Sequence, residues 1–371
     1  MKAAERTSAP GRILIAGVSG VVGFAASHRF ASQGWEVLGL SRRQPDRLPD
    51  GVQHLAVDLA QPSSIAAVHD QLAGVTHLVY AALFEKPGLM PGWREHDQME
   101  RNLTMLSNLY RSLAENGELK HISLLQGTKA YGAHIEPMLV PGRERNPRHR
   151  HENFYWLQED FLRDRQSHAD FALTILRPQV IYGEAQGGNM NPLPALGVYA
   201  ALLRAQGRDL VFPGGVAPVS EAVDADLLAR MLEWAATSSA AANETFNVTN
   251  GDVYCLQNVW PVLAESFGMQ VGNAVPMSLA AEMPGRELEW QKLVDRFGLR
   301  APTSLDTFVG QSFIYADMLL GHGQTTARSP SLVSTIKARH AGFTDCVDTE
   351  DMFARLIANM QAARLLPPRN W

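Results

Sequence analysis

A glycine-rich segment near the start of the chain has the spacing of a phosphate-binding loop. Gly17, Gly20 and Gly23 follow an apolar run and open a stretch with helical periodicity. In a strand–loop–helix unit, the first glycine permits a tight turn, the second admits a pyrophosphate to the backbone, and the third allows close helix packing. The segment, with Ser19 and Val21 in the same loop, therefore predicts a dinucleotide site, because the helix end attracts phosphates. The alternative is a βα turn that binds nothing.

The end of the next apolar run indicates which dinucleotide binds. An NAD site usually has Asp or Glu there, to hold the ribose 2′-hydroxyl. This chain has Arg42 and Arg43 instead, and guanidinium groups suit a 2′-phosphate. We therefore expect NADP(H), although two surface arginines would give the same pattern. Asp58 ends the third apolar run, where it would face the adenine or simply cap the strand.

The usual Tyr-x-x-x-Lys pair of short-chain dehydrogenases is absent, since none of the eight tyrosines has a lysine four residues on. Tyr155 has Glu159 at that place. A catalytic pair must come from elsewhere, and two segments offer one, the first directly after the fifth expected strand and the second at the start of the next helix. Lys129 lies in residues 124–132, and Tyr155 lies in residues 153–160. Both segments should reach the carboxyl edge of the sheet, where ligands bind in open α/β folds.

The elements that must position these residues alternate between short apolar runs and helical patterns. We expect strands at residues 12–16, 35–40, 52–57, 76–82, 120–125 and 171–176. Helical patterns lie between them, notably at residues 21–31, 99–114 and 153–165. Continuous apolar strands separated by helices indicate a parallel sheet that is covered on both faces. The fold class predicted is α/β, with a Rossmann-type doubly wound sheet.

After Gly183 the pattern becomes mostly helical. Helices are expected at residues 193–205, 226–236 and 256–267, with short strands at 210–212 and 245–248. We therefore expect a flexible N-terminus (1–10) and a dinucleotide-binding domain (11–182, with a return segment at about 210–255). A smaller, mostly helical substrate lobe would comprise residues 183–209 and 256–371.

Composition excludes several classes of protein. The chain has 371 residues, of which 46% are hydrophobic and 19% charged, which is typical of a globular protein. Its net charge of −5 gives no basic field for nucleic acid, and no apolar run approaches the ~18 residues of a membrane span. The polar N-terminus lacks a secretory signal, so we expect a cytoplasmic protein. Cys255 and Cys346 are too few for a disulfide framework, and His149 and His151 lack a carboxylate cluster, so we expect no metal.

The segments that contain Lys129 and Tyr155 resemble those of the progesterone 5β-reductase/iridoid synthase family, an atypical branch of the short-chain dehydrogenases. That family has a Gly-x-Lys-x-Tyr segment, here 127–131, and an Asn-Phe-Tyr-Tyr-x-x-Glu-Asp segment, here 153–160. Further similar segments follow in the same order at residues 177–183, 189–191, 197–201, 212–214 and 243–253. The resemblance covers the chain from about Gly11 to its end, and we expect a bacterial-type member.

By this resemblance Tyr155 and Lys129 are the catalytic pair of an NADPH-dependent enzyme that reduces the C=C bond of α,β-unsaturated carbonyls. Hydride would add to the β-carbon, and the Tyr155 hydroxyl would donate a hydrogen bond to the enolate oxygen. Lys129, if close, would stabilise that charge and lower the pKa of the tyrosine. Either residue could instead be structural. Tyr131 is the second candidate for the catalytic tyrosine, and we expect it to lie in the wall of the pocket.

The same resemblance implies further cofactor contacts. These would be Leu59 beside the adenine, Ala82 and Leu83 after the fourth strand, and Tyr155, Pro178, Ile181, Asn189 and Met190 toward the nicotinamide. The chain departs from the plant enzymes at residues 80–83, which lack their tryptophan, and at Leu256, which replaces an aromatic residue. The substrate cannot therefore be transferred from the plant enzymes.

Three functions remain open on these residues. The first is an enone reductase, the second a carbonyl (aldehyde or ketone) reductase on the same scaffold, and the third an NADP-sensing regulator without turnover. Retention of Tyr155 and Lys129 disfavours the regulator. Gly127, where extended short-chain dehydrogenases place Ser or Thr, argues against sugar-nucleotide epimerase chemistry. We expect a small apolar enone or carbonyl substrate, no nucleic-acid or membrane partner and, from the resemblance, a possible homodimer.

Overall fold

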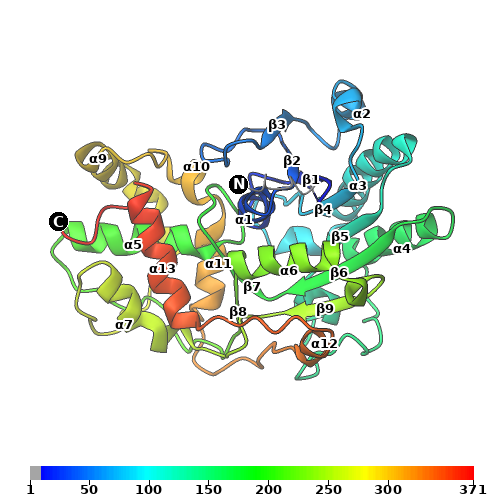
Figure 1. The fold of residues 1–371 in the computed structure, drawn as a ribbon. Helices are drawn as coiled ribbons and strands as arrows, with labels where there is room; N and C mark the ends of the chain where they lie inside the picture. Colours follow the sequence, from blue (N-terminus) through cyan, green and yellow to red (C-terminus); the bar gives the residue numbers. More distant parts are fainter. Residues whose placement is uncertain (1–9) are drawn as a thin grey trace, which may run out of the picture.

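The computed structural model describes residues 10–371, and its centre is a seven-stranded parallel sheet (Figure 1). The spatial order is β3-β2-β1-β4-β5-β6-β9. The strands are β1 (Arg12–Ala16), β2 (Glu36–Ser41), β3 (Gln53–Ala56), β4 (His77–Tyr80), β5 (His121–Leu125), β6 (Ala172–Pro178) and β9 (Thr245–Val248). The expected flexible N-terminus, residues 1–10, lies outside the described residues except for Pro10. The chain order reverses between β1 and β4, and ligands bind beside such a reversal in open α/β sheets.

Helices cover both faces of the sheet. Ile13 and Ile15 of β1 pack with α1 (Val21–Ser32) and α6 (Ala225–Thr237), while Leu14 packs on the opposite side. The opposite face is covered by α2 (Pro62–Ala66), α3 (His96–Asn116) and α4 (Phe154–Gln166). Because successive side chains of a strand point to opposite faces, both faces of a covered sheet must be apolar. The expected α/β class is confirmed.

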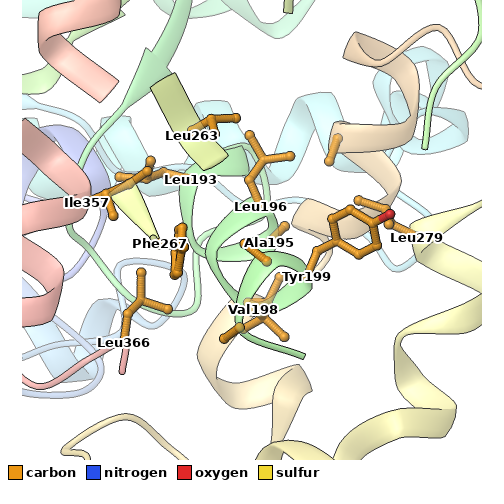
Figure 2. Close-up of a cluster of buried hydrophobic side chains, with 14 of the residues drawn as sticks. Leu193, Ala195, Leu196, Val198, Tyr199, Leu263, Phe267, Leu279, Ile357 and Leu366 are labelled. Carbon is orange, nitrogen blue, oxygen red and sulfur yellow. The ribbon is translucent and has the colours of Figure 1, made fainter. Parts of the chain in front are cut away.

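The remaining helices form a second apolar core beside the sheet, on the left in Figure 1. They are α5 (Pro192–Ala205), α7 (Leu256–Ser266), α8 (Leu279–Glu282), α9 (Glu287–Phe297), α10 (Leu305–Val309), α11 (Ser312–Leu319) and α13 (Thr349–Ala362). Helix α5 is buried from Pro192 to Leu203, as expected of a helix that is apolar all round. Figure 2 shows its side chains surrounded by Leu263 of α7, Leu279 of α8 and Ile357 of α13.

The C-terminal segment does not lie wholly in this helical part. Helix α12 (Ile336–His340) follows the lobe in sequence, but Ala338 and Phe343 pack in the core beneath β9 and α6. Short 3₁₀ turns complete the elements: η1 (His69–Leu72), η2 (Pro91–Arg94), η3 (Thr128–Tyr131), η4 (Ser239–Ala241) and η5 (Pro284–Arg286). A mostly helical C-terminal part is therefore present, while its division from the dinucleotide-binding part into domains stays a prediction.

One predicted strand is wrong, and two short strands were missed. Residues 210–212 form only a single bridge, between Leu210 and Val271. The missed strands are β7 (Val180–Tyr182) and β8 (Ala222–Asp224), which pair with each other outside the main sheet. Runs of three residues are too short for a period of two to be recognised. Within residues 10–371, no helix is long and apolar enough to cross a membrane.

Candidate active site

A cavity of about 380 Å³ lies at the carboxyl edge of the sheet, where the strand order reverses. It is lined by the loops that follow β1 to β6 and by residues 186–191, which precede α5. The predicted residues that it brings together are Gly17, Ser19, Gly20, Val21, Arg42, Arg43, Asp58, Leu59, Ala82, Leu83, Tyr155, Pro178, Ile181, Asn189 and Met190. Two predicted residues, Gly23 and Lys129, do not line it.

The three glycines of the first loop have different structural requirements. Gly17 has a φ of +91°, and a Cβ there would lie 2.8 Å from the backbone of Ala81. A Cβ at Gly23 would lie 2.2 Å from the carbonyl oxygen of Gly17. At Gly20 the nearest atom would be 3.4 Å away, which is ordinary contact. The fold itself therefore requires Gly17 and Gly23, whereas Gly20 leaves open the backbone that a pyrophosphate would approach.

Charged groups at the same end of the cavity suit a phosphorylated ribose. Arg42 and Arg43 are exposed after β2, and neither forms an ion pair with any residue that the structure describes. Two unpaired guanidinium groups fit a 2′-phosphate. Asp58 lines the cavity and also accepts a hydrogen bond from the Ala60 backbone N–H at 3.0 Å, so it serves as a strand-end cap as well.

Tyr155 lies in the first turn of α4, where Asn153 caps the helix. The Asn153 side chain accepts a hydrogen bond from the Tyr155 backbone N–H at 3.1 Å, and it donates one to the Lys129 carbonyl oxygen at 3.2 Å. This amide joins the two predicted catalytic segments. A Cβ at Gly127 would lie 3.3 Å from the Tyr155 hydroxyl, so the missing side chain makes room for it. That hydroxyl forms no hydrogen bond with residues 10–371, and Tyr155 lines the cavity.

The surroundings of Tyr155 keep its hydroxyl protonated. Burial raises the pKa of Tyr155, and the Glu85 carboxylate and Tyr315 raise it further, while Arg177 opposes them. Lys129 is not among these influences, so the expected lowering of the tyrosine pKa by Lys129 is not found. A phenol with a raised pKa acts as a hydrogen-bond donor rather than as a base.

Lys129 is a largely buried lysine, and its ammonium group forms no hydrogen bond with Tyr155. Its Nζ lies 3.8 Å from Glu85 Oε1 and 3.9 Å from the ring centroid of Trp93, without a hydrogen-bond partner in residues 10–371. Burial lowers the pKa of Lys129 to about 8, and Glu85 opposes this shift. The ammonium group is therefore directed toward a carboxyl group.

Glu85 is a cavity residue that sequence reasoning missed. Its side chain is 3% exposed, and its Oε2 accepts hydrogen bonds from Trp93 Nε1 at 3.0 Å and Gln98 Nε2 at 3.2 Å. Burial raises the pKa of Glu85, opposed chiefly by Lys129. The available signal was an acidic residue directly after the fourth strand, at the edge where ligands bind. Other cavity residues missed are Phe84, Arg101, Met105, Gln126, Gln158 and Gln186.

Two further sequence expectations concern residues outside the cavity. Tyr131 does not line the cavity, contrary to the expectation of a place in the pocket wall. Its hydroxyl donates a hydrogen bond to Asn247 Oδ1 at 2.7 Å. His149 and His151 contact each other at 2.8 Å, and His149 also contacts Glu136 at 3.0 Å. Within residues 10–371, no group of three or more His, Cys, Asp or Glu side chains is arranged to hold a metal ion.

Comparison with known proteins identifies a matching family, related proteins and solved structures with a similar fold. Residues 13–249 match the family described as "NAD dependent epimerase/dehydratase family". An (S)-8-oxocitronellyl enol synthase from Nepeta racemosa is 31% identical, covering 95% of this chain and 92% of that protein. Another from Camptotheca acuminata is also 31% identical, covering 95% and 93%. A solved UDP-glucose 4-epimerase from Thermotoga maritima shares the fold at a TM-score of 0.67 and 15% identity, covering 95% of this chain and 99% of that one.

These findings confirm the resemblance at the level of iridoid-synthase-type enzymes. The two named relatives are plant proteins, so they give no support to the expectation of a bacterial-type member. The match to the sugar-nucleotide epimerase shows the fold alone, because the identity is 15%.

Proposed function

This chain belongs to the NAD dependent epimerase/dehydratase family, and on that premise we propose that it reduces the C=C bond of α,β-unsaturated carbonyls with NADPH. It is an NAD(P)-dependent oxidoreductase. The observation that carries the proposal is the Tyr155 hydroxyl. It has no protein partner within residues 10–371, and it shares one cavity with the glycine loop and the free arginines.

The residues of the cavity fit the cofactor and the reaction. The loop from Gly17 to Gly23 would hold the pyrophosphate, and Arg42 and Arg43 would hold the 2′-phosphate. When bound, NADPH supplies hydride for the β-carbon of the enone. The negative charge then moves to the carbonyl oxygen, where the Tyr155 hydroxyl would donate a hydrogen bond. Because burial raises the pKa of Tyr155, this donor keeps its proton at neutral pH.

The proposed reaction is tested by supplying NADPH with small enones and with the matching saturated ketones and aldehydes. We expect NADPH oxidation with enones and a saturated carbonyl as the product. Allylic alcohol as the product, or turnover of saturated carbonyls only, would overturn the proposal in favour of the carbonyl reductase. Tight binding of NADPH without oxidation by any of these acceptors would favour the regulator.

Several finer predictions accompany this proposal. A small apolar enone as the substrate stays a prediction from the sequence. A cytoplasmic location and a homodimer stay predictions from the sequence.

A further inference from the structure

The side-chain amide of Asn153, at the start of α4, makes more contacts than a helix cap needs. Its Oδ1 accepts a hydrogen bond from the Tyr155 backbone N–H at 3.1 Å, and this bond fixes which end of the amide is the oxygen. Its Nδ2 lies 3.2 Å from the Lys129 carbonyl oxygen and 3.1 Å from His151 Nε2. An amide nitrogen donates hydrogen bonds and accepts none. Both neighbours of Nδ2 must therefore accept, so His151 carries no proton on Nε2.

The protonation of two histidines follows from this amide. Without a proton on Nε2, a neutral His151 carries its proton on Nδ1, which lies 2.8 Å from His149 Nδ1. That atom must accept, so His149 carries its proton on Nε2, and this N–H donates to Glu136 Oε1 at 3.0 Å. An added proton on either ring would place two donors face to face. The chain of hydrogen bonds from Asn153 to Glu136 is therefore complete only when both histidines are neutral.

The surroundings of His151 favour its neutral form. Burial lowers the pKa of His151, and His149 lowers it further, while the backbone carbonyl groups of His149 and Lys129 oppose the shift. The His134 ring lies 4.9 Å from the His151 ring, measured between centroids, and burial lowers its pKa as well. The other charged groups nearby are Arg94 of η2, Lys129 of η3, Arg148 before α4, and Glu159 and Asp160 of α4. The two acids of α4 pair with Arg148, whereas Glu136 pairs with His149.

We propose that His151 is a positioning residue for Tyr155, and that its neutral form, with the proton on Nδ1, holds the Asn153 amide in place. This inference rests on the proposed function, in which the Tyr155 hydroxyl donates to the carbonyl oxygen of the substrate. Asn153 caps the turn of α4 that carries Tyr155, so a turn of the amide displaces the hydroxyl. A displacement of about 1 Å can lower a rate by about 100-fold.

The direction of the pH dependence follows from the lowered pKa of His151. The ring is neutral above pH 6.5, the ordinary pKa of histidine, and it gains a proton only at lower pH. A protonated Nε2 repels the Asn153 amide and competes with it for the Lys129 carbonyl oxygen. The positioning contact is therefore present near neutral pH and is lost as the pH falls through the lowered pKa. The value of kcat should fall with it, while the Kd for NADPH should not change.

The first test measures kcat between pH 5 and pH 8, with NADPH and the enone that wild type reduces fastest. His151→Leu removes the acceptor for Asn153 and should lower kcat roughly three- to tenfold at pH 8. His151→Gln has a carbonyl group that can accept the same bond and cannot be protonated. It should restore kcat at pH 8, and toward pH 5 its kcat should fall at least about threefold less than that of wild type.

The matched control is His168→Gln, because His168 is exposed beyond the other end of α4. This variant should follow the wild-type pH profile. Identical profiles for wild type and His151→Gln would overturn the proposal, because the fall in kcat would then come from another group.

A second measurement determines the tautomers without turnover. Long-range ¹H–¹⁵N NMR spectra of the full-length enzyme with ¹⁵N-labelled histidine should show both rings neutral at pH 8. His151 should carry its proton on Nδ1, and His149 should carry its proton on Nε2. The signals are assigned by their loss in His151→Gln and in His149→Gln, and His168→Gln should retain both. A proton on Nε2 of His151 at pH 8 would overturn the proposal.

The outcomes separate the inference from the proposed function. Enone reduction by wild type together with a different tautomer of His151, or with an unchanged acid profile in His151→Gln, would overturn the positioning role and leave the enone reductase standing. Failure of wild type to oxidise NADPH with any enone would overturn the proposed function and, with it, the effect of His151 on kcat, even if the NMR spectra show the expected tautomers.

Discussion

The two ends of the cavity are built from different parts of the chain. The cofactor end is the loop from Gly17 to Gly23 with Arg42 and Arg43, made of backbone and exposed side chains. The chemical end consists of the buried side chains of Tyr155 and Glu85, with Lys129 behind Glu85 and outside the cavity lining. At the cofactor end, the free space around the backbone determines whether the pyrophosphate can bind. At the chemical end, single polar atoms determine whether the substrate can react.

This difference predicts different responses to mutation. Adding one carbon at the cofactor end should disturb the fold or the affinity for cofactor. Removing one oxygen at the chemical end should reduce the rate and leave cofactor affinity nearly unchanged.

The largest expected effect is at the chemical end. Tyr155→Phe removes the hydroxyl that would stabilise the enolate, and loss of one such donor typically lowers the rate by about 10²–10³-fold. We expect that loss in kcat with enones, together with an unchanged Kd for NADPH, measured by steady-state kinetics and by fluorescence titration.

The control for this prediction is Tyr131→Phe. The Tyr131 hydroxyl donates to Asn247 outside the cavity, so its removal should lower stability by about 1–3 kcal/mol while kcat changes little. Comparable losses of kcat in both variants would contradict the assignment of Tyr155 to the chemical end.

The next prediction distinguishes the glycines of the cofactor end. Gly23→Ala places a Cβ 2.2 Å from the Gly17 carbonyl oxygen, and overpacking of this kind typically costs about 1–3 kcal/mol. It should lower Tm even without cofactor. Gly20→Ala meets only ordinary contacts, so it should keep Tm and weaken NADPH binding, because the methyl group takes the space of the pyrophosphate. Gly285→Ala, with open space around it, is the control that should change neither.

The contrast between the two ends of the cavity also explains which features of the fold and the site can be predicted from the sequence. β1 and β9 lie at the predicted residues, and the glycine loop lies in the cavity. Apolar runs and a contiguous motif are local signals, so they can be recognised in the sequence alone. The pairing of Glu85 with Lys129 joins residues 44 positions apart, and it exists only after β4 and β5 lie side by side. No periodicity or spacing in one sequence encodes that contact.

Tyr131 and Tyr155 show where a single sequence leaves two choices. Both tyrosines follow expected strands in segments with suitable composition, and both are buried. Asn247 on β9 satisfies the Tyr131 hydroxyl, and Gly127 leaves space for that of Tyr155. These contacts come from distant parts of the chain. The folded structure is therefore needed to show which of the two hydroxyl groups is available to a substrate.

An effect of similar size, on cofactor affinity alone, should follow at the arginines. Arg42→Ala removes one charge-assisted contact to the 2′-phosphate, and such hydrogen bonds contribute about 1.5–3 kcal/mol. We expect the Kd for NADPH to rise about 10- to 100-fold and the Kd for NADH to remain within about twofold, measured by titration of both cofactors. Arg328→Ala, whose position does not line the cavity, is the matched control. An equal loss for both cofactors would show that Arg42 does not select the 2′-phosphate.

The smallest expected effect is a pH dependence at the chemical end. Burial lowers the pKa of Lys129 to about 8, and the Glu85 carboxylate opposes this shift. The charge of Lys129 in turn helps to lower the pKa of His134. The ammonium form is therefore present below pH 8 and lost above it, about two pH units earlier than for an exposed lysine. If the charge of Lys129 stabilises the enolate, as the family resemblance implies, kcat should fall several-fold between pH 7 and 9. Lys129→Met should have a lower kcat without this inflection. A profile that stays flat to pH 10 in wild type would place Lys129 outside the reaction, and the polar atoms of the chemical end would reduce to Tyr155 and Glu85.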